Sequence, residues 1–433
     1  MFQTLKNAWK VQDIKKKLLF TFLIVILYRL GACIPVPYID ADVFSQFKSA
    51  TSGSIFQYLN ILSGDALGKA TLLALGVNPY ITSSIVMQLL TIAIPALERL
   101  SKEGDEGRKK ITAITRYVTV GLGLITSYGY AMFLKANGWL AVEEGESAVF
   151  PMIVIVACYC AGAALVMWLA EKINDNGIGN GISMILFANI IARGPSVVAS
   201  LWSMIVGANK IVFGILFAVL AILFTLVIVL VIIWMNDSER RIPVQYAKRV
   251  VGRKMYGGQG TNLPIKLNMT GVMPIIFASS IVSIPATIAS FFPNSSFWQG
   301  VVDVFNYDTW LYIIIEALLL IAFAYFYVSI SFNPVEVANN LKKQGGAIPG
   351  IRPGKPTSDY ITRVLNRITL VGAIILAFIC IFPIIVSMAV QSDSFAGLAF
   401  SGSSLIIVIG VALETFREIE AQMSLRNYKG FLD

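Results

Sequence analysis

The sequence contains no histidine and few charged residues. Histidine is the commonest general base and metal ligand near neutral pH, so its absence removes the usual centre of catalysis or metal binding. Of the 433 residues, 14% are charged and 56% are hydrophobic, whereas soluble proteins carry about 25% charged residues. A lipid bilayer is therefore the expected solvent for most of the chain.

Cysteine is also scarce. The four cysteines, Cys33, Cys158, Cys160 and Cys380, all lie inside apolar runs. Cys158 and Cys160 are one residue apart, but no second Cys or His cluster accompanies them, so a zinc site is not indicated. We expect all four to be small buried hydrophobic residues rather than metal ligands or a disulfide framework.

The sequence is instead rich in long apolar runs. A membrane-spanning helix needs about 17–25 residues, and ten runs fit this length. They are residues 18–34, 76–97, 117–134, 150–170, 181–203, 211–235, 270–291, 309–331, 367–390 and 400–417. The fold class predicted from them is an all-α membrane protein with ten transmembrane helices.

Lysine and arginine are concentrated in every second connection. Of the 34 basic residues, 28 fall on one predicted side. That side comprises the N-terminal arm (1–17), the segments 98–116, 171–180, 236–269 and 332–367, and the C-terminal tail (418–433, with Arg417). Because basic loops remain in the cytoplasm, we expect both termini there. Topology thus explains most of the +9 net charge, although this face also suits anionic lipid or ribosomal RNA.

The first apolar run follows Lys15–Lys17, as the apolar core of a signal peptide would. It continues past Arg29 to the turn-forming Pro35 and Pro37, so a retained membrane helix is the preferred interpretation.

The sequence also repeats itself. "GVNPYITSSIV" begins at Gly76 and "GVMPIIFASSIV" begins at Gly271. These segments open the second helix of each predicted half, 18–203 and 204–417, and an odd number of spans per half inverts the second half relative to the first. Gly-x-x-Pro often simply starts a helix, but matched Gly/Pro-interrupted segments in inverted halves indicate a pathway between the halves.

Few ionisable residues lie within the predicted spans. Arg29, Glu316, Glu414 and Arg417 qualify, and no aspartate or histidine relay accompanies them. This pattern argues against a proton- or ion-coupled secondary transporter, although that class remains the alternative because such transporters also use inverted repeats. The Gly-rich segment 176–183 is read as a flexible turn opening the fifth span rather than as a nucleotide loop, because no strand precedes it.

Two segments fit no span. Residues 54–76 are interrupted by Gly64, Asp65 and Gly68. This segment is either a helix on the outer surface, with Asp65 and Lys69 paired, or a small re-entrant helix between the halves. Residues 347–356, "AIPGIRPGKP", are expected to form a stiff basic loop that is neither helix nor strand.

The chain resembles the SecY/Sec61-alpha family of protein-translocation channels over essentially its whole length. The stretches that carry the resemblance are "YRLGACIPVPYID", "LGVNPYITSSIVMQLL", "EGDEGRKKITAITRY", "NGIGNGISMILFANI", "RRIPVQYAKR", "LNMTGVMPIIFASSI", "NPVEVANNLKKQGGAIPGIRPG" and "SLIIVIGVALE". Several independent motifs in the same order make this a specific match.

The resemblance implies a pore closed at mid-membrane by a ring of aliphatic side chains and sealed below by a plug. The implied ring residues are Val77, Ile81, Ile182, Leu186, Ile276 and Ile407. The implied plug covers about residues 54–72 and includes Ile55, Phe56, Tyr58, Leu59, Ile61, Leu62, Gly64 and Leu67. An aliphatic ring offers no polar contact to small ions, so it excludes them when closed. For the segment at 54–76 the resemblance favours the re-entrant interpretation.

The resemblance also implies a lateral gate and a docking surface. At the gate, the seventh and eighth helices separate from the second and third, so that apolar signal sequences and membrane segments enter lipid. The candidate gate residues are Gln88, Ser279 and Ser280. The candidate docking residues are Arg352, Arg240, Arg241, Lys248, Arg249, Lys342, Lys343 and Lys355. A stiff basic loop suits docking because little conformational entropy is lost on binding.

The partners implied are the small membrane subunits SecE and SecG, the motor ATPase SecA, the ribosome with its RNA, signal peptides, nascent chains and membrane lipids. The implied location is the bacterial plasma membrane. We expect a passive conduit with no catalytic residues, no cofactor and no metal. A membrane assembly factor without a pore is a further, weaker alternative.

Overall fold

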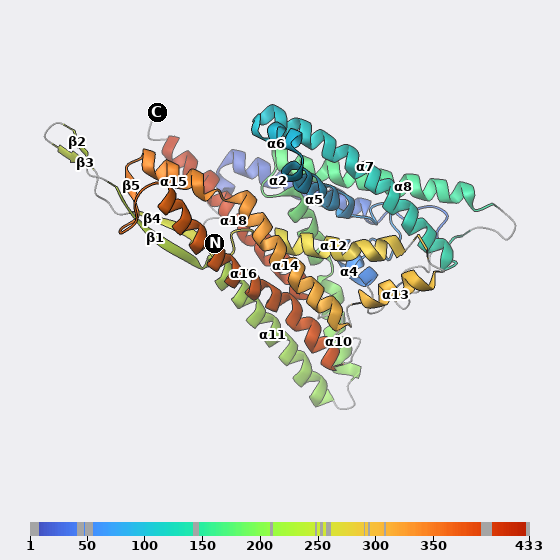
Figure 1. Ribbon diagram of the computed structural model, residues 1–433. Coiled ribbons are helices and arrows are strands. Elements are labelled where there is room, and N and C mark those ends of the chain that lie inside the picture. The colour runs from blue at the N-terminus through green and yellow to red at the C-terminus, as the bar shows by residue number, and fades with distance from the viewer. Residues whose placement is uncertain are drawn as a thin grey trace.

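The computed structural model is an elongated arrangement of helices with a small sheet at one end (Figure 1). It describes residues 8–40, 47, 55–141, 147–207, 211–246, 249–251, 254–256, 261–289, 291–292, 295–306, 309–390 and 401–429.

The first half of the chain forms one group of packed helices. Its helices are α2 (Gln12–Gly31), α4 (Ile55–Leu62), α5 (Asn78–Ala93), α6 (Pro95–Lys102), α7 (Asp105–Ala136), α8 (Val149–Asn176), α9 (Gly181–Ala192) and α10 (Gly194–Gly207). α7 and α8 lie side by side (Figure 1), α5 contacts α7, and α2 contacts α8 and α9. We call α2, α5, α7, α8 and α9 the first helix group.

The second half supplies a second group. Its helices are α11 (Ile211–Asp237), α12 (Met273–Ala289), α13 (Ser296–Val304), α14 (Trp310–Ser331), α15 (Pro334–Lys343), α16 (Lys355–Val390) and α18 (Ser401–Lys429). α14 contacts both α12 and α16, and α18 contacts α11 and α16. We call α11, α12, α14, α16 and α18 the second helix group. α12 also contacts α5 and α7, so it lies where the two groups meet (Figure 1).

Several helices have the length and composition of membrane spans. Six described helices pass that test, and the bent pair α5–α6 would add a seventh. Each of the ten predicted runs contains a described helix. α12 is only 17 residues long, α2 begins with three lysines in its first two turns, and α18 carries charged residues through its second half. Membrane-spanning helices are therefore established, while the exact number of ten stays a prediction.

Two predicted spans are divided in the structure. The run at 76–97 is broken where α5 ends at Ala93 and α6 leaves at 100°. Pro95 explains the break, because proline pushes the preceding residue out of the helical region, and Ile94 is extended. The run at 181–203 is divided between α9 and α10 at Arg193.

A small sheet joins the two basic segments that the sequence suggested were loops. β1 (Glu239–Tyr246) pairs antiparallel with β4 (Thr261–Lys266), and its end pairs with β5 (Gly346–Ala347). In this register Ile242 faces Leu263 and Gln245 faces Ala347. β2 (Arg249–Val251) and β3 (Lys254–Tyr256) form a hairpin beyond the sheet (Figure 1).

The expectation that residues 347–356 are neither helix nor strand was wrong at both ends of that segment. Ala347 belongs to β5, because its backbone pairs with Gln245 across the two basic segments. Lys355 and Pro356 open α16, where proline is tolerated because the first N–H groups of a helix have no intrahelical acceptor. Only the residues between them form the turn.

The repeated motif adopts the same backbone in both halves. Gly76 and Gly271 have φ of +54° and +63°, a region open to glycine without strain. The next residues, Val77 and Val272, are each 2% exposed, and a helix starts directly after each of them. The sequence repeat therefore corresponds to a structural repeat.

The expectation that all four cysteines are buried was wrong. Only Cys380 is buried, Cys158 and Cys160 are partly exposed, and Cys33 is exposed; all four are free thiols. In a membrane protein an apolar segment also covers the outer surface, which lipid solvates, so an apolar run does not imply burial inside the protein.

Candidate functional site

The six predicted ring residues meet in the central hydrophobic cluster. Five of them are at most 3% exposed, and the sixth, Ile182, is partly buried against the same cluster. They come from the start of α5 and from α9, α12 and α18, so both helix groups contribute. All six side chains are aliphatic and offer no ligand to a small ion. The six predicted residues therefore share one apolar cluster to which both helix groups contribute.

The predicted plug packs directly on this cluster. We use "plug segment" for residues 55–72, which begin with α4. Ile61 and Leu62 belong to the central cluster, whereas Leu67 packs in a neighbouring cluster with Tyr130 and Tyr159. α4 contacts α9 and α12. This burial favours the re-entrant interpretation over a helix on the outer surface.

Not every predicted plug residue is described to the same extent. Leu59 packs partly buried against the neighbouring cluster, and Gly64 has φ of +67°. The backbone of Ile55, Phe56 and Tyr58 lies in α4, but their side chains fall outside the described part of the structure. Asp65 forms an ion pair with Arg193, the residue that follows α9, with 3.3 Å between Oδ1 and Nε.

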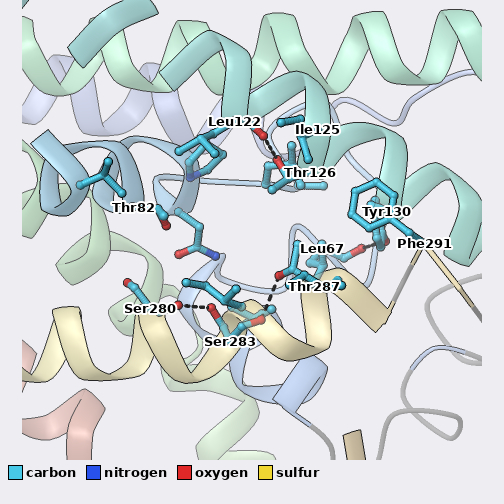
Figure 2. A pocket seen from close by; sticks show the side chains of 18 residues that line it. Leu67, Thr82, Leu122, Ile125, Thr126, Tyr130, Ser280, Ser283, Thr287 and Phe291 are labelled. Carbon is cyan, nitrogen blue, oxygen red and sulfur yellow. Dashed lines mark hydrogen bonds between the residues drawn. The ribbon is translucent and has the colours of Figure 1, made fainter. Parts of the chain in front are cut away.

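A cavity of about 360 Å³ lies beside the plug between α5, α7 and α12. Figure 2 shows Thr82, Thr126 and Tyr130 on one side of it and the α12 side chains on the other. Leu67 of the plug segment also lines it, between the side chains of α7 and those of α12 (Figure 2). Most of the lining is apolar, with hydroxyl groups spaced along it. The cavity therefore lies where α12 meets the first helix group.

Of the predicted gate residues, only Ser280 lines this cavity. Ser279 is 3% exposed and donates to the carbonyl of Ile275 at 2.9 Å. Gln88 donates to Ser84 on its own helix at 3.4 Å and does not line the cavity. The cavity-lining hydroxyls that the sequence analysis missed on α12 are Ser283 and Thr287. They continue from Ser280 at intervals of three and four residues, the helical spacing that would have identified them.

The cavity-lining hydroxyl groups on α12 donate hydrogen bonds to backbone carbonyls of the same helix. Ser280 donates to the carbonyl of Ile276, Ser283 to that of Ser280, and Thr287 to that of Ser283, all within 3.0 Å. Figure 2 shows the last two bonds along the cavity wall. A helix whose hydroxyls bond to its own backbone needs no polar partner across the cavity. Each of these three hydroxyl groups therefore has an acceptor within α12 itself.

The predicted docking residues gather on the sheet and the turn that follows it. The side chains of Ile242, Val244, Ile265 and Ile348 pack with α15 and the start of α16 in a separate hydrophobic cluster. The described docking side chains are all exposed around it, namely Arg240, Arg241, Lys342, Lys343, Arg352 and Lys355. Arg249 lies in β2, but its side chain and all of Lys248 fall outside the described residues. One packed module thus presents the basic side chains of both segments.

Local signals fix the parts of this module. Asn333 caps α15 by accepting from the N–H groups of Val335 and Glu336, while Lys342 and Lys343 occupy its last turn, as the helix dipole favours. The hydroxyl of Thr357 donates to the carbonyl of Arg352 at 2.9 Å. At the base of the sheet, burial and the nearby Arg417 lower the pKa of Lys266. The turn that carries Arg352 is therefore held at one end by the pairing of β5 with β1 and at the other by the hydrogen bond from Thr357.

Known proteins match this chain along its length. The family model SecY matches residues 71–416. The chain is 43% identical over 442 residues to the protein translocase subunit SecY of Streptomyces griseus, and 42% identical over 449 residues to that of Mycobacterium tuberculosis, with 100% of each chain covered. The chain belongs to the SecY family. The resemblance drawn from the sequence motifs is confirmed.

Solved structures agree on the fold. A structure described as that of a protein conducting channel matches with a TM-score of 0.63 at 18% identity, covering 94% of this chain and 92% of the other. Sec61 in a canine ribosome-channel complex matches with a TM-score of 0.59 at 16% identity over the same shares. A third structure, with a TM-score of 0.62 and 17% identity, is titled for a SecY plug domain that stabilises the closed state. This chain therefore shares the fold of the SecY family's channels.

Proposed function

We propose that this chain is the pore-forming subunit of a bacterial protein translocase. It is a gated conduit that passes unfolded preproteins across the plasma membrane and releases transmembrane segments sideways into lipid. The observation that carries the proposal is the stack of the plug segment on an aliphatic cluster contributed by both helix groups. This geometry closes a path between the groups without any ion-binding side chain. Membership of the SecY family does not favour the secondary-transporter alternative.

In this proposal the ring is formed by the six aliphatic residues, and the cavity between α5, α7 and α12 marks the lateral gate. An apolar signal sequence enters there as α12 and α14 move away from α5 and α7. Transfer of apolar surface from water into lipid drives its exit. Ser280, Ser283 and Thr287 line the opening, and Gln88 and Ser279 are not part of it.

The chain performs no catalysis of its own in this proposal. The motor ATPase SecA or a translating ribosome supplies the energy and docks on the exposed basic module, which is cytoplasmic together with both termini. Ribosomal RNA is a suitable ligand for the basic side chains. SecE and SecG are the small membrane partners, and anionic lipid contacts the same face.

Photocrosslinking of a stalled preprotein tests the path. We expect a photoreactive residue at Ile81 or Ile276 to crosslink to the stalled chain in the assembled complex. The same probe at Leu220, which is 52% exposed on α11, is the matched control and should label lipid only. Ring adducts in at least about tenfold excess over the control are expected, because covalent capture requires the reacting atoms to be close together.

Equal labelling at Leu220 and at the ring would contradict a central path. Labelling at neither position, with the preprotein shown to be stalled on the complex, would contradict the conduit itself.

A further inference from the structure

The plug segment is tied to the first helix group by a buried asparagine. Asn189 of α9 is fully buried, and its Nδ2 donates to the backbone carbonyl of Leu62 at 2.8 Å and to the hydroxyl of Tyr28 at 2.9 Å. Its Oδ1 accepts from Arg29 at 3.4 Å. Leu62 is the last residue of α4, so one side chain links α9, α2 and the plug segment.

Glycine at position 64 allows the plug segment to lie close to Arg29 and Asn189. Its φ is +67°, and a Cβ placed there would lie 2.7 Å from Nη1 of Arg29 and 3.0 Å from Oδ1 of Asn189. The first distance is shorter than contacts that real Cβ atoms make, and the second is tighter than nine in ten of them. Any other residue at Gly64 would push Arg29 and Asn189 away from the plug segment.

An ion pair holds the next residue. Oδ1 of Asp65 lies 3.3 Å from Nε of Arg193 and also accepts from Nδ2 of Asn60 at 3.0 Å. The side chains of Asp65 and Arg193 are each 21% exposed, so the pair is shielded from water more than a surface pair. Asp65 itself has φ of +67° and Ala70 has φ of +47°, and such left-handed non-glycine residues persist only where surrounding contacts hold them.

The partners of these polar contacts all lie in one half of the molecule. Asn189 and Arg193 belong to α9 and the break after it, Tyr28 and Arg29 to α2, and Tyr130 of α7 donates to the carbonyl of Leu67 at 2.6 Å. In the described part of the chain, the plug segment meets α12 of the second helix group without a hydrogen bond or ion pair. The described polar contacts of the plug segment with other elements therefore anchor it to the first helix group.

We propose that Asn189, Arg193 and Asp65 form a latch that keeps the plug segment seated and sets the threshold for opening. This inference deepens the proposed channel function and rests on it. Breaking the latch leaves the carbonyl of Leu62 unpaired in an apolar centre, which is costly, whereas the left-handed backbone at Asp65 and Ala70 favours release. The latch contacts all join the plug segment to the first helix group, so the latch decides whether the plug segment leaves its seat when the two groups part.

The test measures ion conductance of the complete complex in planar bilayers without a substrate. Asn189→Leu keeps the side chain's size and removes all three hydrogen bonds, and we expect resting conductance to rise about tenfold. Asp65→Arg and Arg193→Asp should each raise it, and the double exchange should return it toward wild type because the ion pair is restored. Thr225→Val is the control, since that hydroxyl donates to the carbonyl of Ala221 within α11 and does not line the cavity.

Thermal unfolding and co-purification of the small membrane subunits show that each variant is folded and assembled.

A variant lacking residues 55–72 distinguishes failure of the latch proposal from failure of the proposed channel function. If that variant conducts while Asn189→Leu and both charge variants remain at wild-type conductance, the latch is overturned and the channel stands. If the deletion variant also shows no conductance, the proposed channel function is wrong, and the latch proposal is wrong with it.

Discussion

Arg352→Glu is expected to reduce SecA-driven preprotein translocation to background while leaving the protein folded. Arg352 is exposed on the turn between β5 and α16, and within the described residues its guanidinium makes no hydrogen bond or ion pair. Surface substitutions of this kind change stability by about 0.5 kcal/mol or less. Charge reversal places a carboxylate in the centre of the proposed docking surface, where like-charge contact costs several kcal/mol. Translocation into vesicles should fall at least about a hundredfold, since each 1.4 kcal/mol is tenfold.

The controls isolate docking from folding. Arg363→Glu makes the same charge change at another exposed position on α16 and should retain most activity. Arg352→Lys keeps the charge but loses the planar guanidinium, so an intermediate rate is expected. Wild-type translocation by Arg352→Glu, with SecA saturating, would remove Arg352 from the docking surface.

Ile81→Asn or Ile276→Asn is expected to make resting channels leak ions. Both side chains are at most 3% exposed and lie in the cluster on which the plug segment rests. A buried amide without a partner costs about 1–3 kcal/mol, and water entering the ring offsets that cost. Hydrophobic constrictions close by excluding water, so a hydrated ring conducts. We expect single-channel recordings to show resting conductance at least about tenfold above wild type.

Ile81→Val and Ile276→Val are the matched variants. They remove one methylene and should cost about 0.5–1.5 kcal/mol of stability without hydrating the ring, so their conductance should stay low. The paired positions in the two repeats allow a second comparison, because equal leaks at Ile81 and Ile276 indicate equivalent roles. If neither asparagine variant leaks ions while the variant lacking residues 55–72 conducts, the plug alone seals the channel.

The sequence was sufficient to predict the helices, the repeat and the aliphatic cluster. Long apolar runs determine membrane helices almost by themselves, because a bilayer leaves the backbone few alternatives. The motifs at Gly76 and Gly271 located the start of α5 and α12, and Gly's access to positive φ explains why both glycines are there. The six ring residues followed from the family resemblance, and the structure brings them into one cluster.

The sheet and the contacts of the plug segment could not be predicted from the sequence. Gln245 and Ala347 pair across about a hundred residues, and a two-residue strand such as β5 carries no periodic signal. Asn189 looked like one polar residue in an apolar run, because its partner is the backbone carbonyl of Leu62. Gln88 and Ser279 were named as gate residues from their polarity, but the direction of a side chain on a helix depends on packing between helices. Long-range partners of this kind depend on tertiary structure.

The pairing of β1 with β5 has a mechanical consequence. β1 follows α11, β4 leads toward α12, and β5 lies between α14 and α16. One sheet therefore connects the ends of four helices of the second helix group. In the proposed function, a force that a docked partner applies at the turn carrying Arg352 would be distributed over these helices, because the sheet connects their ends. Movement of the second helix group would then leave the plug segment held by its hydrogen bonds to Tyr130 of α7 and Asn189 of α9.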